Sequence, residues 1–325
     1  MISVVVPTFD RPDGLKRAVR SLFEQTYAET GFELIVVDNT PGATASGAIA
    51  ELQAECPAKI TMIALHEPAP GVANARNAAM AAVKTDLVAY LDDDQSAPNT
   101  WLASLVQNHK IYPAAVTFGP VQTVLPKGQR RHQTYFENFF AREPDLETGY
   151  IEESFGSGNA LVDFSRIHGG APWFDPAMNE LGGEDDLLFG RARKSKGRFA
   201  WANEAPVWEY PLVSRVALRY TLRRAFSYGQ APIMLARRQG RGRLSLILYW
   251  MLVGAGKTAF HGVQWVGLSL IRHPGRAFQL DRAIRGLAKV FWGLDFKFYG
   301  AAALKSKTAK PAPMDATSDL AEQAG

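Results

Sequence analysis

Short runs of apolar, β-branched residues recur along the first hundred positions of the chain. They occupy residues 2–6, 32–37, 60–65 and 87–91, and their starts lie about thirty residues apart. Segments with helical spacing of apolar positions separate these runs, as in residues 15–23 and 72–83. Fully apolar strands that alternate with helices are typical of a parallel sheet covered on both faces. The pattern therefore predicts a doubly wound α/β domain.

The pattern changes after about residue 101. An apolar run covers residues 114–118, a glycine-rich turn covers residues 156–159, and helical spacing predicts a helix from Glu184 to Ser195. Residues 211–300 have helical spacing throughout, and residues 301–325 are rich in Ala, Lys, Thr and Pro. We therefore expect an α/β domain over 1–210, a basic helical region over 211–300 and a disordered tail over 301–325.

Charge is divided unevenly along the 325 residues, although the net charge is only +4. Residues 1–210 contain 18 Lys/Arg and 27 Asp/Glu, whereas residues 211–310 contain 18 and 2. A basic, apolar second part indicates an anionic partner, such as a membrane surface, a phosphorylated lipid or a nucleic acid. The single Cys56 excludes a disulfide framework and a multi-cysteine zinc site. Met1 leads directly into the first apolar run without a secretory signal, so we expect the front part to fold in the cytoplasm.

Polar residues follow the first two predicted strands, where ligands of open α/β sheets bind. The segment PTFDRP at residues 7–12 lacks the G-x-G-x-x-G fingerprint, which argues against a nicotinamide or flavin domain. Asp38 ends the second run, and its carboxylate is suited to accept hydrogen bonds from a nucleobase N–H or a ribose hydroxyl. The alternative for Asp38 is a turn or a helix cap.

The fourth run ends in three consecutive acids, Asp92, Asp93 and Asp94. In an extended segment the side chains at i and i+2 project to the same side, so Asp92 and Asp94 can converge on one cation while Asp93 points elsewhere. Two hard oxygen ligands on a partly open site suit Mg²⁺ or Mn²⁺. The alternative is that Asp94 or Asn99 caps the helix that follows.

Together these segments resemble the nucleotide-sugar half of family 2 inverting glycosyltransferases with the GT-A fold. The motifs are PTFDRP at 7–12, VVDN at 36–39, GVANARN at 71–77 and YLDDD at 90–94, and the resemblance covers residues 1 to about 215. It implies that Asp92 and Asp94 form the metal-binding D-x-D motif. It also implies a donor-nucleotide pocket formed by Pro7, Thr8, Arg11, Asp38, Arg76 and Asp93.

A second acidic motif, GGEDDL at residues 182–187, stands at the start of a predicted helix. Acids in the first turn of a helix are often simple caps. The segment nevertheless resembles the Glu-Asp motif of the same family, which implies that Asp185 is the catalytic base and that Glu184 and Asp186 position the acceptor. Trp173 is a further candidate for stacking on an acceptor sugar, with a core position as the alternative. The implied reaction inverts the anomeric configuration in one displacement, and the loop at 156–159 is expected near the donor.

Residues 244–271 are long enough to cross a bilayer, with 18 apolar residues among 28. Lys257 and His261 near the middle, and arginine clusters at both ends, instead favour two helices in the membrane interface or a re-entrant pair. The alternative is a helical subdomain that packs on the α/β core. GAGKT at 254–258 lacks the first glycine of a P-loop and no strand precedes it, which excludes that motif.

These observations lead to one main functional prediction. It is a metal-dependent glycosyltransferase, using Mn²⁺ or Mg²⁺, that moves a sugar from a nucleotide-diphosphate sugar, expected to be UDP-linked, to a lipid-linked saccharide. We expect it at the cytoplasmic face of the inner membrane, with a polyprenyl-diphosphate-linked acceptor, an anionic membrane surface and no nucleic acid as partners. Residues 211–230 also resemble bacterial exopolysaccharide glycosyltransferases of the succinoglycan type. The alternatives are a nucleotidyltransferase of sugar phosphates and a non-enzymatic peripheral membrane-binding protein.

Overall fold

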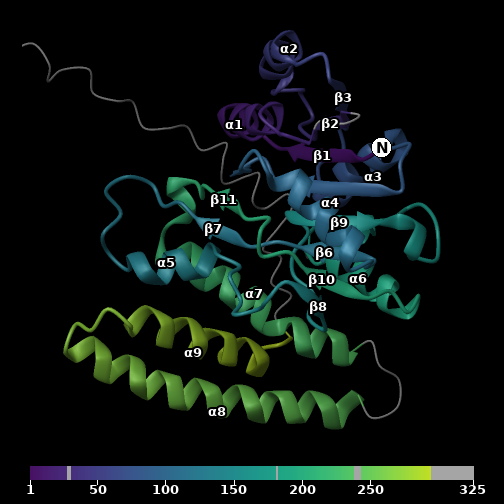
Figure 1. Ribbon diagram of the computed structural model, residues 1–325. Helices are drawn as coiled ribbons and strands as arrows, with labels where there is room; N and C mark the ends of the chain where they lie inside the picture. The colour runs from purple at the N-terminus through teal and green to yellow at the C-terminus, as the bar shows by residue number, and fades with distance from the viewer. Residues whose placement is uncertain (28–30, 181, 238–242, 294–325) are drawn as a thin grey trace, which may run out of the picture.

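A mostly parallel sheet forms the centre of the molecule in the computed structural model, which describes residues 1–27, 31–180, 182–237 and 243–293. The strand order is β3-β2-β1-β4-β9-β6-β10-β8 (Figure 1). The strands are β1 (Ser3–Thr8), β2 (Phe32–Asp38), β3 (Ile60–His66), β4 (Leu87–Leu91), β6 (Val116–Phe118), β8 (Gly149–Ile151), β9 (Asn159–Asp163) and β10 (Phe199–Trp201). Strands β1 to β4 pair in parallel, as the spacing of the apolar runs predicts, whereas β9 runs antiparallel to both β4 and β6.

Helices cover both faces of this sheet, because successive strand residues point to opposite sides. Val4 packs with α1 (Pro12–Phe23), α2 (Ser46–Glu55) and α4 (Trp101–Ile111). Val5 packs on the other face with α3 (Val72–Ala82) and α6 (Glu184–Lys194). Helices α3 and α6 therefore begin on the same face of the sheet. This brings the motif that contains Arg76 close to the acidic motif that contains Glu184, although the two are far apart in the sequence.

A smaller sheet adjoins the acidic end of β4. Its order is β5 (Gln95–Ser96), β11 (Val207–Glu209) and β7 (Val121–Thr123). Strand β5 begins directly after Asp94, and its Gln95 pairs with Glu209. The backbone N–H of Tyr210 donates to the carbonyl of Asp94 at 2.8 Å. This sheet therefore carries Glu209 to the end of β4.

The C-terminal helices pack on the α/β core through α5 (Gln133–Phe140). They are α7 (Leu218–Arg237), α8 (Arg243–Leu270) and α9 (Arg276–Val290), which confirms the helical prediction for these residues. Helix α9 lies between α7 and α8, and α8 is outermost (Figure 1). The Tyr135 hydroxyl of α5 donates to the buried Asp281 of α9 at 3.1 Å. The region is thus docked as a subdomain, as the packing alternative predicts, and GAGKT lies inside α8.

The sequence also predicts that this helical region contacts a membrane, and that contact stays a prediction. Among the described residues, no helix combines the length and the apolar character that crossing a bilayer requires. The predicted tail at 301–325 lies outside the described residues.

Candidate active site

The carboxyl ends of β1, β2 and β4 meet at one edge of the sheet. Thr8 pairs with Asp38, and β1 pairs on its other side with β4, which leads into Asp92. Strand β9 begins at Asn159 opposite Leu91, so the preceding glycine-rich loop reaches the same edge. The fold therefore gathers here most of the residues that the sequence motifs single out.

Asp93 ties the loop after β1 to the end of β4. Its carboxylate accepts hydrogen bonds from the Thr8 hydroxyl at 2.8 Å, the Phe9 N–H at 3.2 Å and Arg11 Nη1 at 2.8 Å. Burial raises the pKa of Asp93 to about 6, against the opposing effect of the Arg11 guanidinium. Thr8 and Arg11 bind this carboxylate, and the same Arg11 Nη1 also binds Asp94, so Asp93 does not point away from Asp94 as the extended-strand argument predicts. The reason is that β4 ends at Leu91 and the acids lie in the turn that follows. Their contact with a donor nucleotide stays a prediction.

Asp92 and Asp94 face different cations. Asp94 Oδ2 accepts a hydrogen bond from Arg11 Nη1 at 2.6 Å and lies 3.5 Å from Arg215 Nη1. Asp92 Oδ1 lies 3.5 Å from Arg76 Nη2, and 37% of the Asp92 side chain is exposed. Asp94 does not cap α4, whose first flanking residue is Thr100 and has no side-chain cap. The structure therefore contradicts the alternative in which Asp94 caps α4.

The chemistry of these donors fits a divalent cation that takes its other ligands from water and substrate. Carboxylate oxygens from two aspartates are the ligands that Mg²⁺ and Mn²⁺ accept. Over the described part of the chain, no cluster of three or more His, Cys, Asp or Glu residues surrounds a metal position. A cation held by Asp92 and Asp94 would therefore depend on the diphosphate for further ligands, and Arg11 would have to move off Asp94.

Glu209 adds a third carboxylate that the sequence motifs do not assign. Burial raises its pKa to about 7, and the negative charges of Asp94 and Asp92 add to this shift. Such a shift shows that negative charge is concentrated at the end of β4. Glu209 carries no local sequence signal beyond its place after an apolar pair, because the small sheet that positions it is assembled from three separate segments.

The raised pKa of Glu209 predicts how stability depends on pH. A carboxyl group that is easier to protonate in the folded state stabilises the fold below about pH 4.5, its unfolded value, and loses this contribution as pH rises through about 7. We expect the free energy of unfolding to fall by about 2 kcal/mol over this range without divalent cations. Urea titrations from pH 4.5 to 8 test this. Glu209→Gln should make the free energy of unfolding depend less steeply on pH. Part of the dependence should remain, because the pKa of Asp93 is also raised. An unchanged dependence in Glu209→Gln would contradict the prediction.

Arg76 connects the two acidic motifs. Its guanidinium is 4% exposed, and Nη1 donates to Glu184 Oε1 at 2.6 Å while Nη2 faces Asp92. The ring of Phe174 lies 5.5 Å from the guanidinium carbon. Glu184 is itself buried, and its pKa is raised by burial against the effect of Arg76. The structure therefore places Arg76 and Glu184 as a buried pair. Contact of Arg76 with a base or diphosphate, and of Glu184 with an acceptor, stay predictions.

This buried pair predicts a large stability effect. Arg76→Met leaves the Glu184 carboxylate buried without its cation, so we expect the free energy of unfolding to fall by about 3 kcal/mol in urea titrations. Arg20→Met is the control, because Arg20 pairs with Glu51 and Glu55 on the exposed surface and its loss should change little. The double variant Arg76→Met/Glu184→Gln should recover part of the loss. Equal effects of the two single variants would contradict a structural role for Arg76.

Two adjacent residues of the glycine-rich loop lie against two different carboxylates, that of the candidate base Asp185 and that of the candidate metal ligand Asp92. Asp185 Oδ2 accepts hydrogen bonds from Ser157 N at 3.1 Å and from Ser157 Oγ at 3.3 Å. At the next residue, Gly158, a Cβ atom would lie only 2.2 Å from Asp92 Oδ2, so a larger residue there would displace the Asp92 carboxylate. Asp92 and Asp185 are thus neighbours across two residues of one loop. A Cβ at Gly156 would lie 2.2 Å from Arg142 Nη1, which brings a further cation to the loop.

The remaining predicted site residues lie as follows. Asp185 is partly exposed, Asp186 is exposed, and burial together with Asp185 raises the pKa of Asp186. Asp38 is 2% exposed and accepts hydrogen bonds from Thr40 and from Ala45 N at 2.7 Å. The bond from Thr40 N is the turn geometry that was one alternative for Asp38, and its contact with a nucleobase or a ribose stays a prediction. Pro7 is half-buried beside β2.

Trp173 lies with core residues. Its ring packs edge-on against Phe164 at 4.6 Å, and Phe164 follows the far end of β9, away from Asn159. The Arg191 guanidinium lies 5.0 Å from the Trp173 ring. Trp173 is half-buried against the apolar core, as its core alternative predicts, and its contact with an acceptor sugar stays a prediction.

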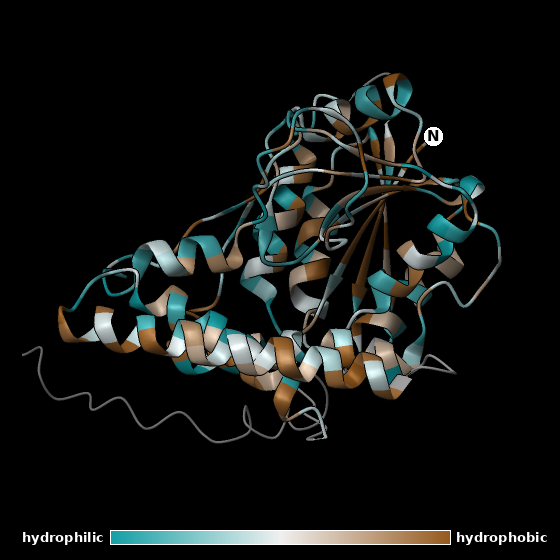
Figure 2. Cartoon of the chain, turned by 90° about the horizontal axis from the view of Figure 1, so that it is seen from below, coloured by the Kyte–Doolittle hydropathy of each residue, from teal (hydrophilic) through white to brown (hydrophobic). Residues whose placement is uncertain are grey.

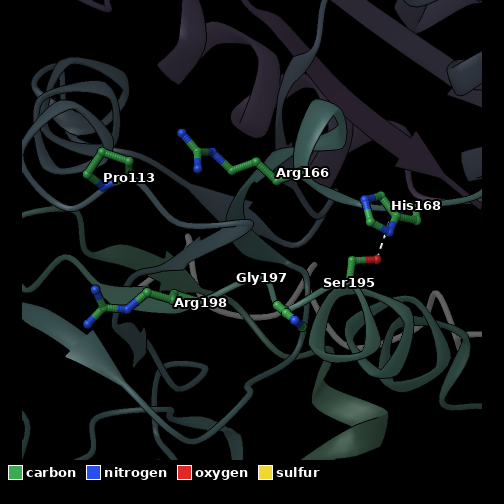
Figure 3. Close-up of a pocket in the computed structure, with 7 residues that line it drawn as sticks. Pro113, Arg166, His168, Ser195, Gly197 and Arg198 are labelled. Carbon is green, nitrogen blue, oxygen red and sulfur yellow. Dashed lines mark hydrogen bonds between the residues drawn. The ribbon is translucent and has the colours of Figure 1, made fainter.

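A cavity of about 280 Å³ lies away from these carboxylates, beside Arg166, His168 and Arg198 (Figure 3). Arg166 follows β9 and Arg198 precedes β10, whereas the acidic motifs follow β4 and precede α6. Arg166 pairs with Asp163 at 2.7 Å, and Arg198 lies over the Tyr150 ring at 3.1 Å. The two arginines of this cavity are therefore already partnered.

The segments that gather at the strand ends match a known protein family. Residues 3–168 match the family described as Glycosyl transferase family 2. The chain belongs to this family. It is therefore a glycosyltransferase, as the motifs predict, and its central sheet with C-terminal helices is a GT-A-like arrangement.

Two relatives of this glycosyltransferase show the extent of the similarity. The succinoglycan biosynthesis protein ExoM of Rhizobium meliloti is 28% identical over 267 residues, covering 80% of this chain and 82% of ExoM, which supports the predicted likeness to exopolysaccharide enzymes. The pre-mycofactocin glycosyltransferase of Mycobacterium tuberculosis is 28% identical over 270 residues, covering 78% of this chain and 53% of that protein.

Two solved structures share the fold. The mannosyltransferase PcManGT from Pyrobaculum calidifontis, in complex with GDP-Man and Mn²⁺, has a TM-score of 0.60 at 18% identity and covers 90% of this chain and 88% of its own. The S. aureus protein TarS has a TM-score of 0.50 at 15% identity, covering 87% of this chain and 54% of TarS. At these identities the likeness concerns the fold.

Proposed function

We propose that this glycosyltransferase moves a sugar from a nucleotide-diphosphate sugar to a hydroxyl of a lipid-linked saccharide, with inversion and with the help of a divalent cation. One observation carries the proposal: adjacent residues of a single loop, Ser157 and Gly158, contact Asp185 and Asp92. A leaving diphosphate and a proton-accepting carboxylate must both lie close to the anomeric carbon, and this arrangement supplies the two functions from one loop.

Asp185 is the proposed base. Its carboxylate is held by Ser157 and stays partly exposed, so it can take the proton from an acceptor hydroxyl as that oxygen attacks. Arg11 and Arg215 place positive charge beside Asp94, where an anionic diphosphate would lie. A divalent cation bound to Asp92 and Asp94 would neutralise charge on the departing nucleoside diphosphate. Attack from the side opposite this group inverts the configuration without a covalent intermediate.

The comparisons support a nucleotide-sugar donor and a role in polysaccharide biosynthesis. PcManGT, which shares the fold, holds a nucleotide sugar and Mn²⁺, and ExoM acts in the biosynthesis of succinoglycan, a polysaccharide. We therefore propose polysaccharide biosynthesis as the context and a polyprenyl-diphosphate-linked saccharide as the acceptor. The basic, partly apolar helices α7 to α9 support a peripheral position at the cytoplasmic face of the inner membrane.

The test uses the purified full chain with Mn²⁺ and a panel of UDP-linked and GDP-linked sugars. Release of a nucleoside diphosphate in the presence of lipid-linked saccharides from bacterial membranes is expected, and NMR of the product should show an anomeric configuration opposite to that of the donor. Retention of configuration would refute the mechanism. Release of pyrophosphate from a sugar phosphate and a nucleoside triphosphate would identify a nucleotidyltransferase. Vesicle binding without any metal-dependent nucleotide binding would identify the non-enzymatic alternative.

A further inference from the structure

A half-buried cation outside the sequence motifs, Arg142, lies against the glycine-rich loop at residues 156–159. Its Nη1 atom lies 2.2 Å, and Asp185 Oδ2 lies 3.7 Å, from the position that a Cβ atom of Gly156 would occupy. The guanidinium of Arg142 and the carboxylate of the candidate base therefore flank the same residue of the loop. Two residues further on, Gly158 lies against Asp92, so this short segment joins the candidate base to the candidate metal ligand.

The small sheet fixes the backbone of Arg142. Arg142 N donates to the Val121 carbonyl at 2.8 Å, and Val121 N donates to the Arg142 carbonyl at 3.0 Å, so Arg142 adds one bridge to the edge of β7. Strand β11, which pairs with β7 on its other side, carries Glu209. A functional side chain is held more precisely when a sheet supports its backbone than when a free loop does.

The positive charge of Arg142 acts on two carboxylates at the end of β4. Burial raises the pKa of Asp92, and the charges of Arg76 and Arg142 oppose this increase. Burial and Asp94 raise the pKa of Glu209, and the charge of Arg142 again opposes the increase. The strands of the central sheet are hydrophobic along most of their length (Figure 2), so the charges at this edge come from segments that follow or adjoin the strands.

Arg142 differs in position from the other cations near the acidic turn. Arg11 and Arg215 lie beside Asp94, whereas Arg142 lies beside the glycine-rich loop. In the proposed displacement, the bond from the anomeric carbon to a β-phosphate oxygen breaks and its electron pair stays on that oxygen. The acceptor oxygen forms the new bond and its proton passes to Asp185. Positive charge on the loop side is therefore positioned to meet the leaving group as it gains negative charge.

We propose that Arg142 binds the β-phosphate of the nucleotide-sugar donor and stabilises the negative charge that this group gains as the sugar leaves. A guanidinium keeps its charge at every physiological pH and can donate two parallel hydrogen bonds to phosphate oxygens. The inference rests on the proposed donor class and adds a residue to its site. The alternative is that Arg142 only balances the charge of Glu209 and contacts no substrate.

The test is calorimetry of the full chain with Mn²⁺ and four nucleotides: UDP, GDP, UMP and GMP. Arg142→Gln should bind the preferred nucleoside diphosphate roughly thirtyfold more weakly than wild type, because it loses a charged hydrogen-bond donor. It should bind the matching monophosphate within about twofold of wild type, since that ligand has no β-phosphate. Arg142→Lys keeps one positive charge and should lose less affinity for the diphosphate.

Arg198→Gln is the matched control. It removes the same charge from a residue that precedes β10 and lies over the Tyr150 ring, so both affinities should stay within about twofold of wild type. An equal loss in this control would replace the inference with diffuse attraction of the nucleotide.

The remaining outcomes separate the inference from the proposed function. An unchanged diphosphate affinity in Arg142→Gln would overturn the inference. Equal losses for the diphosphate and the monophosphate would also overturn it and would assign Arg142 the charge-balancing role beside Glu209. If wild type binds neither UDP nor GDP, the proposed donor class fails and the inference fails with it. Monophosphate binding by the variant shows in the same experiment that its site is folded.

Discussion

Replacing Asp185 with asparagine is expected to lower kcat about a thousandfold, because general-base catalysis contributes on this scale. The amide oxygen of the variant can still accept the hydrogen bonds of Ser157 but cannot take a proton from an acceptor hydroxyl. The donor site is unchanged, so the affinity for the nucleotide in the presence of Mn²⁺ should stay within about twofold of wild type. Nucleoside diphosphate release gives kcat, and calorimetry gives the nucleotide affinity.

Asp186→Asn is the matched control for this prediction. Asp186 is the next residue of the same helix turn, and it is exposed and without a bond to the glycine-rich loop, so its loss should reduce kcat less than about tenfold. The reverse pattern, a severe loss in Asp186→Asn and near-normal kcat in Asp185→Asn, would assign the base to Asp186. The raised pKa of Asp186 makes that outcome chemically reasonable, and the two variants therefore decide between the two carboxylates.

The sheet and its acidic edge were predictable because both leave a local signal. A strand buried on both faces must be largely apolar, and the runs at β1, β2 and β4 lie in such buried strands. The third run forms β3, which is largely apolar but lies at the edge of the sheet and is partly exposed. In parallel strands the carboxyl ends share an edge, so the sequence alone is enough to bring the acids that follow β4 to the edge where Thr8 lies, although it does not predict that Asp93 is the acid that binds Thr8. The short antiparallel strands β8 to β10 have no comparable signal, since three to five residues are too few to show a period.

The contacts that organise the site have no local signal at all. Arg76 and Glu184 are 108 positions apart, and their pairing follows from α3 and α6 covering the same face of the sheet. Glu209 reaches Asp94 only because the small sheet joins segments from three places in the chain. The hydrogen bonds of Asp38 show the converse: the turn that it forms with Thr40 involves residues close in sequence, and the turn alternative predicts this bond.

The basic region was predictable in its helices and faces but not in its packing. Arg282, Arg285 and Lys289 share a face of α9, as their spacing requires, yet this face lines a groove against α8. Amphipathic spacing alone cannot say which partner covers a helix face. In this protein a buried hydrogen bond between Tyr135 and Asp281 holds α9 against α5, and α8 is the outermost helix.

Replacing Asp94 with asparagine is the second variant with a large expected effect. Removing one of two candidate metal-binding carboxylates should lower kcat/KM about a thousandfold, the scale on which lost electrostatic stabilisation of a leaving group acts. The variant removes the charged partner of Arg215 and one of the two carboxylates that hold Arg11, so the donor site should bind a nucleoside diphosphate without the increase in affinity that Mn²⁺ gives to wild type. Calorimetry of nucleotide binding with and without Mn²⁺, and Mn²⁺ titration followed by electron paramagnetic resonance, measure this separately from turnover.

Asp93→Asn separates a metal role from simple loss of an acid in the same segment. Asp93 is the adjacent residue, but its carboxylate points to Thr8 and Arg11, so its replacement should alter the free energy of unfolding and leave the Mn²⁺ dependence of nucleotide binding intact. If Asp94→Asn keeps that dependence, or if Asp93→Asn loses it to the same extent, the cation does not bind to the carboxylate of Asp94. The two residues lie in the same turn and share Arg11, but only Asp93 is also held by Thr8, so the pair separates a metal ligand from a carboxylate with a structural role.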